Sequence, residues 1–112
     1  MVKLIKKEEG KIRIISENYQ VNNFITKEIS EKVSVAISEG NNYQKTTKNI
    51  ESDRVYYVLE GKLIVNNDLI AEEGDFIFVP KGEEYTFSGT FKTILINSPA
   101  FGAKSEEIKE LK

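Results

Sequence analysis

The stretch that decides the fold is Gly74-Asp75-Phe76-Ile77-Phe78-Val79-Pro80-Lys81-Gly82-Glu83-Glu84-Tyr85. Its residues 75 to 79 are rich in aromatic and β-branched side chains, which favour an extended strand. A glycine precedes this segment, and a proline and a second glycine follow it, as is typical of turns. The stretch therefore predicts a short strand between two tight turns, with a new strand beginning near Tyr85.

Apolar and polar residues alternate elsewhere in the chain, as in a half-buried strand. Val33, Val35 and Ile37 fall on one face of an extended segment. The turn signals outside the first stretch are Glu39-Gly40-Asn41-Asn42, Glu60-Gly61, Asn66-Asn67-Asp68 and Ser88-Gly89. Turns at intervals of about eight to twelve residues are typical of an all-β sandwich or barrel.

Several elements follow from local patterns. The Asn66-Asn67 pair predicts a tight hairpin, because asparagine tolerates positive φ. Further strands are expected over residues 11–15, 24–29, 85–87 and 91–96. The tail carries a serine suited to capping, two acids and a basic end, and this pattern predicts a short C-terminal helix over about 105–111.

This frame resembles the cupin family. The second cupin motif reads Gly, five residues, Pro, one residue, Gly, two residues, His, and Gly74, Pro80 and Gly82 match it. Tyr57-Val58-Leu59-Glu60-Gly61 resembles the strand and turn that close the first motif. The resemblance covers about residues 33–101 and implies a jelly-roll barrel, the double-stranded β-helix of cupins. We expect one domain over residues 1–112, with N-terminal strands in residues 2–30.

The Leu-Glu-Gly turn and the Pro-Lys-Gly motif are also similar to those of the ethanolamine-utilisation cupin, a metal-poor relative linked to acetate kinase activity. That likeness is mostly one of fold. The chain has no glycine-rich phosphate cradle that would support nucleotide chemistry.

The sequence departs from the cupin pattern at every metal-binding position. Tyr85 replaces the histidine of the second motif, and Arg54 stands where the first motif has its glutamate. The paired histidines correspond to Thr47 and Asn49, or to the next residue in each case if the loop is one residue shorter. A guanidinium keeps its proton and repels a metal cation. We therefore expect no metal and no cofactor.

One route to a metal site remains open. The chain contains no His and no Cys, so only oxygen ligands are available. A bulge that turned Glu51 or Asp53 into the barrel would restore a carboxylate.

Arg54 is the leading candidate for a functional residue. A guanidinium inside an apolar barrel needs a partner, since an unpaired buried charge costs several kcal/mol. The partner is either an internal acid, such as Glu51, Glu60 or Glu83, or an anionic ligand held by two parallel hydrogen bonds. Exposure at the barrel mouth is a further structural explanation.

The expected ligand-binding set is Arg54, Tyr56, Tyr85, Asn49 and Thr47. Tyrosines in a lumen supply hydroxyl groups and aromatic walls for a small ligand, or they simply fill a vacated metal site. No motif marks a catalytic residue. Without histidine, the candidates for acid–base chemistry are Tyr85, Tyr56, Lys92, Lys45 and a carboxylate with a raised pKa.

Bulk composition narrows the function classes. The 112 residues carry 16 basic and 18 acidic side chains and a net charge of −2, which gives no basic surface for nucleic acid. The charged start lacks the apolar run of a signal peptide or a spanning helix. We expect a cytoplasmic protein that partners neither nucleic acid nor membrane, and a homodimer that covers apolar N-terminal strands.

Three hypotheses remain. The first is a metal-independent barrel that binds a small polar or anionic metabolite in its lumen. The second is a metal-independent isomerase, epimerase or lyase with a tyrosine or lysine as general base. The third is a structural barrel without a ligand, which an open lumen would eliminate.

Overall fold

The computed structural model describes residues 1–102 and 106–109 of the chain, and more than half of them belong to antiparallel strands. In chain order the elements are η1 (Lys7–Glu9), β1 (Lys11–Ser16), β2 (Tyr19–Ile25), β3 (Ser34–Asn49), β4 (Asp53–Gly61), β5 (Leu63–Val65), β6 (Leu69–Ala71), β7 (Phe76–Val79), β8 (Glu84–Ser98) and β9 (Glu106–Lys109). Within these ranges no helix has the length and apolar character needed to span a bilayer.

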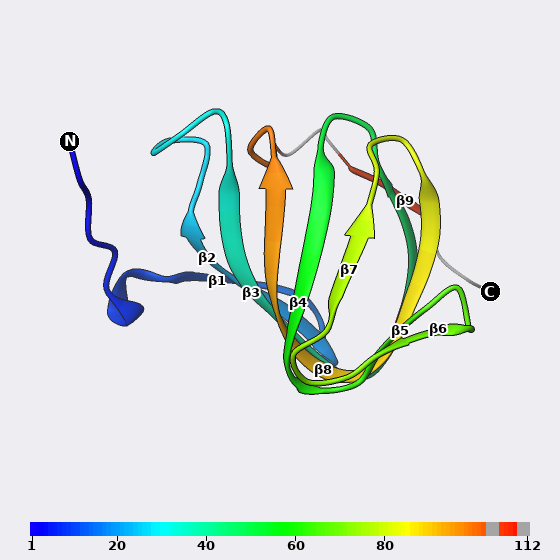
Figure 1. Cartoon of the computed structure of the whole chain (residues 1–112). Helices are drawn as coiled ribbons and strands as arrows, with labels where there is room; N and C mark the ends of the chain where they lie inside the picture. Colours follow the sequence, from blue (N-terminus) through cyan, green and yellow to red (C-terminus); the bar gives the residue numbers. More distant parts are fainter. Residues whose placement is uncertain (103–105, 110–112) are drawn as a thin grey trace.

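Two long strands, β3 and β8, build the barrel (Figure 1). The first half of β3 and the second half of β8 lie in a sheet with the strand order β1-β2-β3-β8-β4-β7. The other half continues into a second layer, where β5 and β9 flank the same two strands. The all-β prediction is confirmed. Two layers that share bent strands form a jelly-roll barrel with the lumen between them, the architecture that the cupin resemblance implies.

A bulge produces the bend. The register of β3 against β8 shifts between Gly40 and Tyr43. Asn42 adopts a φ of 49°, and Gly89 opposite adopts 118°. The extra residue reverses which side chains of β3 face inward, because strand side chains alternate with period 2. Even-numbered residues from 34 to 40 are buried before the bulge, and residues 45, 47 and 49 after it.

The lumen is filled by one cluster of side chains. Its hydrophobic members are Tyr19, Val21, Ala36, Tyr56, Val58, Leu63, Val65, Ala71, Val79, Tyr85, Phe87, Phe91 and Leu95. Ser38 and Thr93 add a buried hydroxyl pair 2.6 Å apart. Polar side chains are also buried next to this cluster, and each of them needs a hydrogen-bond partner. The hydrogen-bond network that they form is the candidate site.

The hairpin prediction is confirmed, and other local predictions need correction. Asn66 and Asn67 have φ values of 54° and 64° and connect β5 to β6. The second N-terminal strand begins at Tyr19 and ends at Ile25, so the expected strand over 24–29 is wrong. Burial of Tyr19 and Val21 against the lumen fixes that strand.

The predicted C-terminal helix is also wrong. Residues 106–109 form β9, which pairs with residues 46–49 of β3. The remainder of the predicted helix, residues 105, 110 and 111, lies outside the described residues. A short isolated helix is marginal in water, whereas a strand added at an open sheet edge gains ladder hydrogen bonds.

Candidate functional site

The local sequence of β4 turns Arg54 and Tyr56 into the lumen. Alternation along this strand buries Arg54, Tyr56 and Val58 and leaves the residues between them on the outer side. Tyr85 enters from the first half of β8, opposite Thr47 of β3. These side chains come from strands far apart in sequence, and the barrel brings them together.

A chain of hydrogen bonds links them. Arg54 is only 3% exposed, its Nε donates to Oδ1 of Asn97 at 2.7 Å, and its Nη1 donates to the Tyr85 hydroxyl at 2.9 Å. The Tyr85 and Tyr56 hydroxyls lie 2.5 Å apart. The guanidinium is thus held by neutral oxygens in these contacts, which fix its orientation and preserve its positive charge.

Asn49 and Thr47 line the neighbouring part of β3. The Nδ2 of Asn49 donates weakly to Oδ1 of Asn97, at 3.4 Å, and so reaches the same cluster. Its Oδ1 accepts the backbone N–H groups of Glu51 and Ser52 at 3.0 and 2.8 Å. Asn49 therefore shapes the turn between β3 and β4. Thr47 is fully buried beside Tyr85 in the register.

The carboxylates that would restore a metal site lie elsewhere. Glu51 and Asp53 are exposed, and Oδ1 of Asp53 accepts the backbone N–H of Lys81 at 2.9 Å. In the part of the chain that the structure describes, no three Asp, Glu, His or Cys side chains gather in a way that suits a metal ion. At the aligned position stands the cation of Arg54, whose charge opposes metal binding.

A small cavity opens beside Arg54. Its volume is about 30 Å³, and its polar lining includes Arg13, Asn23, Ser34, Lys45, Arg54 and Asn97. A space of this size holds about one water molecule or a small ion. The described lining residues include three basic side chains and no acidic ones.

Phe101 lines this cavity. Its ring centroid lies 5.3 Å from the Cζ of Arg13 and 6.0 Å from the Cζ of Arg54. The backbone N–H of Phe101 donates to Ser34 Oγ at 2.9 Å, which anchors the residue at the mouth. The ring thus separates two guanidinium groups by cation–π contacts.

Lys45 approaches the cavity from β3. The side chain is 7% exposed, and its Nζ lies 5.8 Å from the centre of the Tyr19 ring. Tyr19 in turn stacks on Tyr43, with ring centroids 4.6 Å apart. The aliphatic stem of the lysine is therefore packed in the aromatic core while its charge faces the cavity.

Burial raises the pKa of Tyr56 well above 10.0. Desolvation is the main cause, and the neighbouring Tyr85 raises the pKa further, while the charge of Arg54 opposes the shift. The phenol of Tyr56 therefore stays protonated and serves as a neutral hydrogen-bonding group at physiological pH.

Sequence reasoning missed several parts of this site. Asn97 is the hydrogen-bond partner of Arg54 inside the barrel. The alternation of residues 91–96, continued by one residue, would have placed it on the inner face. Phe101 follows the last expected strand, and Arg13 belongs to β1, so no local pattern connects either of them to the lumen. For Lys45, the sequence indicates only a candidate for acid–base chemistry.

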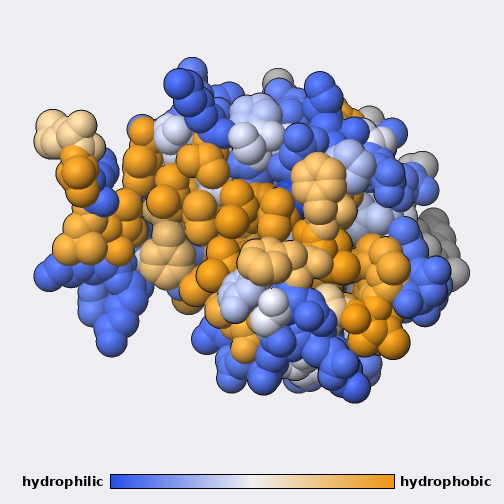
Figure 2. Space-filling model, viewed as in Figure 1, coloured by the Kyte–Doolittle hydropathy of each residue, from blue (hydrophilic) through white to orange (hydrophobic). Residues whose placement is uncertain are grey.

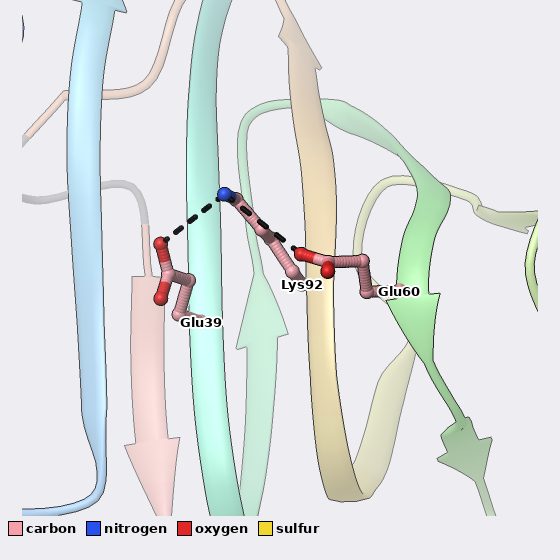
Figure 3. Close-up of polar contacts among 3 residues, drawn as sticks. All are labelled: Glu39, Glu60 and Lys92. Atoms are coloured by element: carbon pink, nitrogen blue, oxygen red, sulfur yellow. Dashed lines mark ion pairs between the residues drawn. The ribbon is translucent and has the colours of Figure 1, made fainter.

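Lys92 lies away from the lumen. Its Nζ is 3.9 Å from carboxylate oxygens of both Glu39 and Glu60 (Figure 3). These side chains border a surface groove of about 500 Å³ at the opposite end of the barrel. The interaction is an exposed one and contributes little to stability. Lys92 is therefore not positioned for acid–base chemistry in the lumen.

Known proteins support the fold. A family model described as ethanolamine utilisation protein EutQ matches residues 2–102. Comparison with curated protein sequences finds no match. Streptomyces PAC13 with uridine has a similar structure, with a TM-score of 0.82, 21% identity, and coverage of 98% of this chain and 93% of that one. PAC13 is described as a nucleoside dehydratase.

Two further structures have the same fold. An ethanolamine utilisation protein Q from Salmonella typhimurium gives a TM-score of 0.74 at 24% identity and covers 89% of this chain and 88% of that one. KdgF from Halomonas gives 0.77 at 13% identity, with coverage of 90% and 96%. Likeness at these identities shows a shared cupin-type barrel and nothing finer.

Proposed function

Because the chain belongs to the EutQ family of ethanolamine utilisation proteins, whose cupin-type barrel encloses a lumen, we propose that it binds a small anionic metabolite there without a metal. The observation that carries the proposal is the basic lining of the cavity. Arg13, Lys45 and Arg54 line one small cavity from three different strands, and Lys45 and Arg54 are buried while Arg13 is exposed. A carboxylate or phosphate group in that space would meet the two buried charges of Lys45 and Arg54 in a low-dielectric setting, with the exposed charge of Arg13 beside them.

The arrangement around Arg54 prepares it for such a ligand. The side-chain oxygens of Asn97 and Tyr85, which are neutral, each accept a hydrogen bond from one N–H of Arg54. These two hydrogen bonds hold the planar guanidinium in place. A preorganised guanidinium loses little entropy when it binds a planar or tetrahedral anion. Tyr56 and Tyr85 add hydroxyl groups within the same network, suited to a hydroxyl or carbonyl group on the ligand.

Binding requires the cavity to enlarge. About 30 Å³ accommodates an ion or a water but not a whole metabolite. Phe101 is the side chain whose displacement would join the space between Arg13 and Arg54 to the cavity. The anion then replaces the aromatic ring between the two guanidinium groups.

A thermal-shift and calorimetry screen tests the proposal. The probes are acetate, glycolate, inorganic phosphate, uridine and uridine 5′-monophosphate, with wild type beside Arg54→Met and Lys45→Met. We expect anionic probes to raise the melting temperature of wild type, and each variant to lose at least about tenfold in affinity. Lys62→Met is the matched control, since Lys62 is exposed and does not line the cavity.

The stability of Arg54→Met separates ligand binding from a structural role. Removal of a buried charge that serves a ligand leaves the melting temperature unchanged or raises it. Loss of about 3 kcal/mol in Arg54→Met, together with a wild type that responds to none of the anions, would favour the structural barrel instead.

The second candidate is a metal-independent enzyme of the lyase or isomerase type. It rests on the Tyr85 hydroxyl, which lies between a guanidinium and a second phenol. A neighbouring positive charge stabilises the phenolate form that a general base needs. Turnover of an anionic substrate that Tyr85→Phe abolishes while binding persists would support this candidate. Unchanged turnover in Tyr85→Phe would exclude this tyrosine as the base.

A further inference from the structure

A row of polar side chains crosses the inner face of the main sheet beside the small cavity. Ser34 of β3 lies directly opposite Asn97 of β8, and Asn97 lies directly opposite Arg54 of β4. These side chains are only 8%, 4% and 3% exposed, and all three line the cavity of about 30 Å³. Directly opposite residues bring their Cβ atoms within about 5 Å of each other. The row therefore presents three polar groups to one small space.

The polarity of this row is the reverse of the usual pattern. A sheet with one solvated side normally turns its apolar side chains inward and its polar ones to the water. Next to the row, the outward-pointing residues are Val35, Ile96 and Val55, and Figure 2 shows a broad hydrophobic surface across the middle of the molecule. Polar groups that are buried against this pattern cost free energy unless they are satisfied, and such departures are expected at functional sites.

The amide of Asn97 has one end engaged and the other directed to the cavity. Its Oδ1 accepts the Nε–H of Arg54 at 2.7 Å, and because that nitrogen can only donate, the orientation of the amide is fixed. Nδ2 then carries two N–H donors, and neither has an acceptor among the residues that the structure describes. Because Asn97 lines the cavity, a small acceptor there would meet these donors.

Ser34 offers a second donor of the same kind. Its Oγ accepts the backbone N–H of Phe101 at 2.9 Å. Within residues 1–102 and 106–109, the hydroxyl proton of Ser34 has no acceptor of its own. Buried polar groups are nearly always paired, so each exception calls for an explanation. Two neighbouring donors without an acceptor indicate that the acceptor comes from outside the chain.

The rest of the lining favours an anion over a water molecule. Lys45 and Arg54 bring two buried cations to the cavity. The side-chain oxygens of Ser34 and Asn97 are already engaged, and Asn23 contributes the remaining side-chain amide oxygen of the lining. A water molecule would find few acceptors for its own protons in such a space, whereas an anion only accepts.

The size of the cavity selects an anion of a single atom. About 30 Å³ holds about one water molecule or a small ion. A carboxylate or phosphate ester brings further atoms, for which Phe101 must move. We propose that the site, with Phe101 in place, binds one halide ion, chloride under physiological conditions, held by the donors of Ser34 and Asn97 beside the two buried cations.

This inference rests on the proposed function, because the halide occupies the cavity that an anionic metabolite would enter, and it adds a form of regulation. The halide must leave before the larger anion can bind. Chloride therefore competes with the metabolite, and the apparent affinity for the metabolite depends on the chloride concentration.

Anomalous diffraction from crystals soaked in sodium bromide locates the ion directly. In wild type we expect one ordered bromide within hydrogen-bond distance of Asn97 Nδ2 and Ser34 Oγ. Asn97→Asp keeps an oxygen for the Nε–H of Arg54 but replaces the free donors by a negatively charged oxygen, so this variant should hold no bromide there. The matched control is Ser38→Ala, which removes a buried hydroxyl of the same strand that bonds to Thr93 and does not line the cavity. The control should keep the ion.

Thermal melting at constant ionic strength gives a second measurement. Replacement of sodium fluoride by sodium chloride or sodium bromide should raise the melting temperature of wild type, because a bound ion stabilises the folded state. Fluoride should have no such effect, since the smaller ion loses more hydration free energy on burial. The rise should be absent from Asn97→Asp and from Ser34→Ala, and it should persist in Ser38→Ala.

Calorimetry with inorganic phosphate, with and without chloride, distinguishes this inference from the proposed function. At a concentration of about ten times its own Kd, chloride should weaken phosphate binding about tenfold. Phosphate binding that chloride does not affect, with no bromide in the cavity, would overturn the halide site and leave the proposed function standing. Bromide in the cavity of a protein that binds none of the larger anions would support the halide site and overturn the proposed function. A protein that binds neither would overturn both.

Discussion

The hydroxyl oxygen of Tyr85 lies 2.5 Å from that of Tyr56 and 2.9 Å from Nη1 of Arg54. These three polar side chains share one network, which Asn97 joins through Arg54, next to a cluster of aromatic and aliphatic groups. Removal of the Tyr56 or the Tyr85 hydroxyl leaves a buried partner short of a hydrogen bond, which costs about 1–3 kcal/mol. The network therefore couples the proposed binding residues to the stability of the barrel.

The raised pKa of Tyr56 predicts a loss of stability at high pH. In the unfolded chain this phenol loses its proton near pH 10, whereas in the folded barrel it stays protonated to higher pH. The stabilisation is fully present below pH 10 and declines above it, by at most about 1.4 kcal/mol per pH unit. Urea unfolding at stepwise increasing pH measures the slope. Tyr56→Phe should make the loss of stability with rising pH less steep. An equal slope in this variant would show that other groups cause the loss.

Much of the fold could be predicted from the sequence because turns are encoded locally. Gly74 and Gly82 adopt φ values of 90° and 84° in the motif that suggested the barrel, and Gly61 adopts 78° at the end of β4. Such conformations favour glycine. The error at the C-terminus has a non-local cause, because β9 forms by pairing with an open edge of β3. The local capping signals cannot indicate that a distant strand offers an open edge.

Prediction of the site was limited in the same way. Alternation along β4 is enough to place Arg54 and Tyr56 together. Arg13 and Phe101 reach the cavity only because the strands close into a barrel. The early apolar residues of β3 illustrate a further limit. Val35 and Ile37 share a face as expected, but it is the outer face, while the small Ala36 and Ser38 point into the lumen.

The motif glycines should differ in their tolerance of a side chain. A Cβ at Gly61 would lie 2.2 Å from the backbone oxygen of Thr90, whereas a Cβ at Gly82 would meet nothing within 4 Å. Both residues have positive φ, which costs about 1 kcal/mol for alanine. We expect Gly82→Ala to lose about that much and Gly61→Ala to lose at least about 3 kcal/mol, since its backbone must also move. Urea unfolding of both variants gives the comparison, and equal losses would contradict it.

Asn22 offers a stabilising substitution. Its Oδ1 is buried with no hydrogen-bond partner among the described residues, and a Cβ added at Gly10 would lie 2.3 Å from it. Asn22→Val removes this unsatisfied oxygen and places a β-branched residue in a strand, so we expect a gain of about 1 kcal/mol. Asn23→Val is the control, because Nδ2 of Asn23 donates to the Lys11 carbonyl at 3.2 Å. We expect the Asn23→Val variant to be less stable than wild type. Both are compared with wild type by urea unfolding at one protein concentration, because dimerisation would shift the midpoint.

Phe101→Ala tests whether the ring between the two guanidinium groups competes with an anion. The truncation removes the cation–π contacts to Arg13 and Arg54 and enlarges a cavity of about 30 Å³. If the anion takes the place of the ring, its affinity should rise about tenfold, since the cost of displacing Phe101 disappears. Calorimetry with inorganic phosphate and uridine 5′-monophosphate measures the change. Phe101→Leu keeps an apolar cover without the aromatic face, and it should give an intermediate affinity. Weaker binding in Phe101→Ala would show that the ring contacts the ligand, and the proposed route into the lumen would then be wrong.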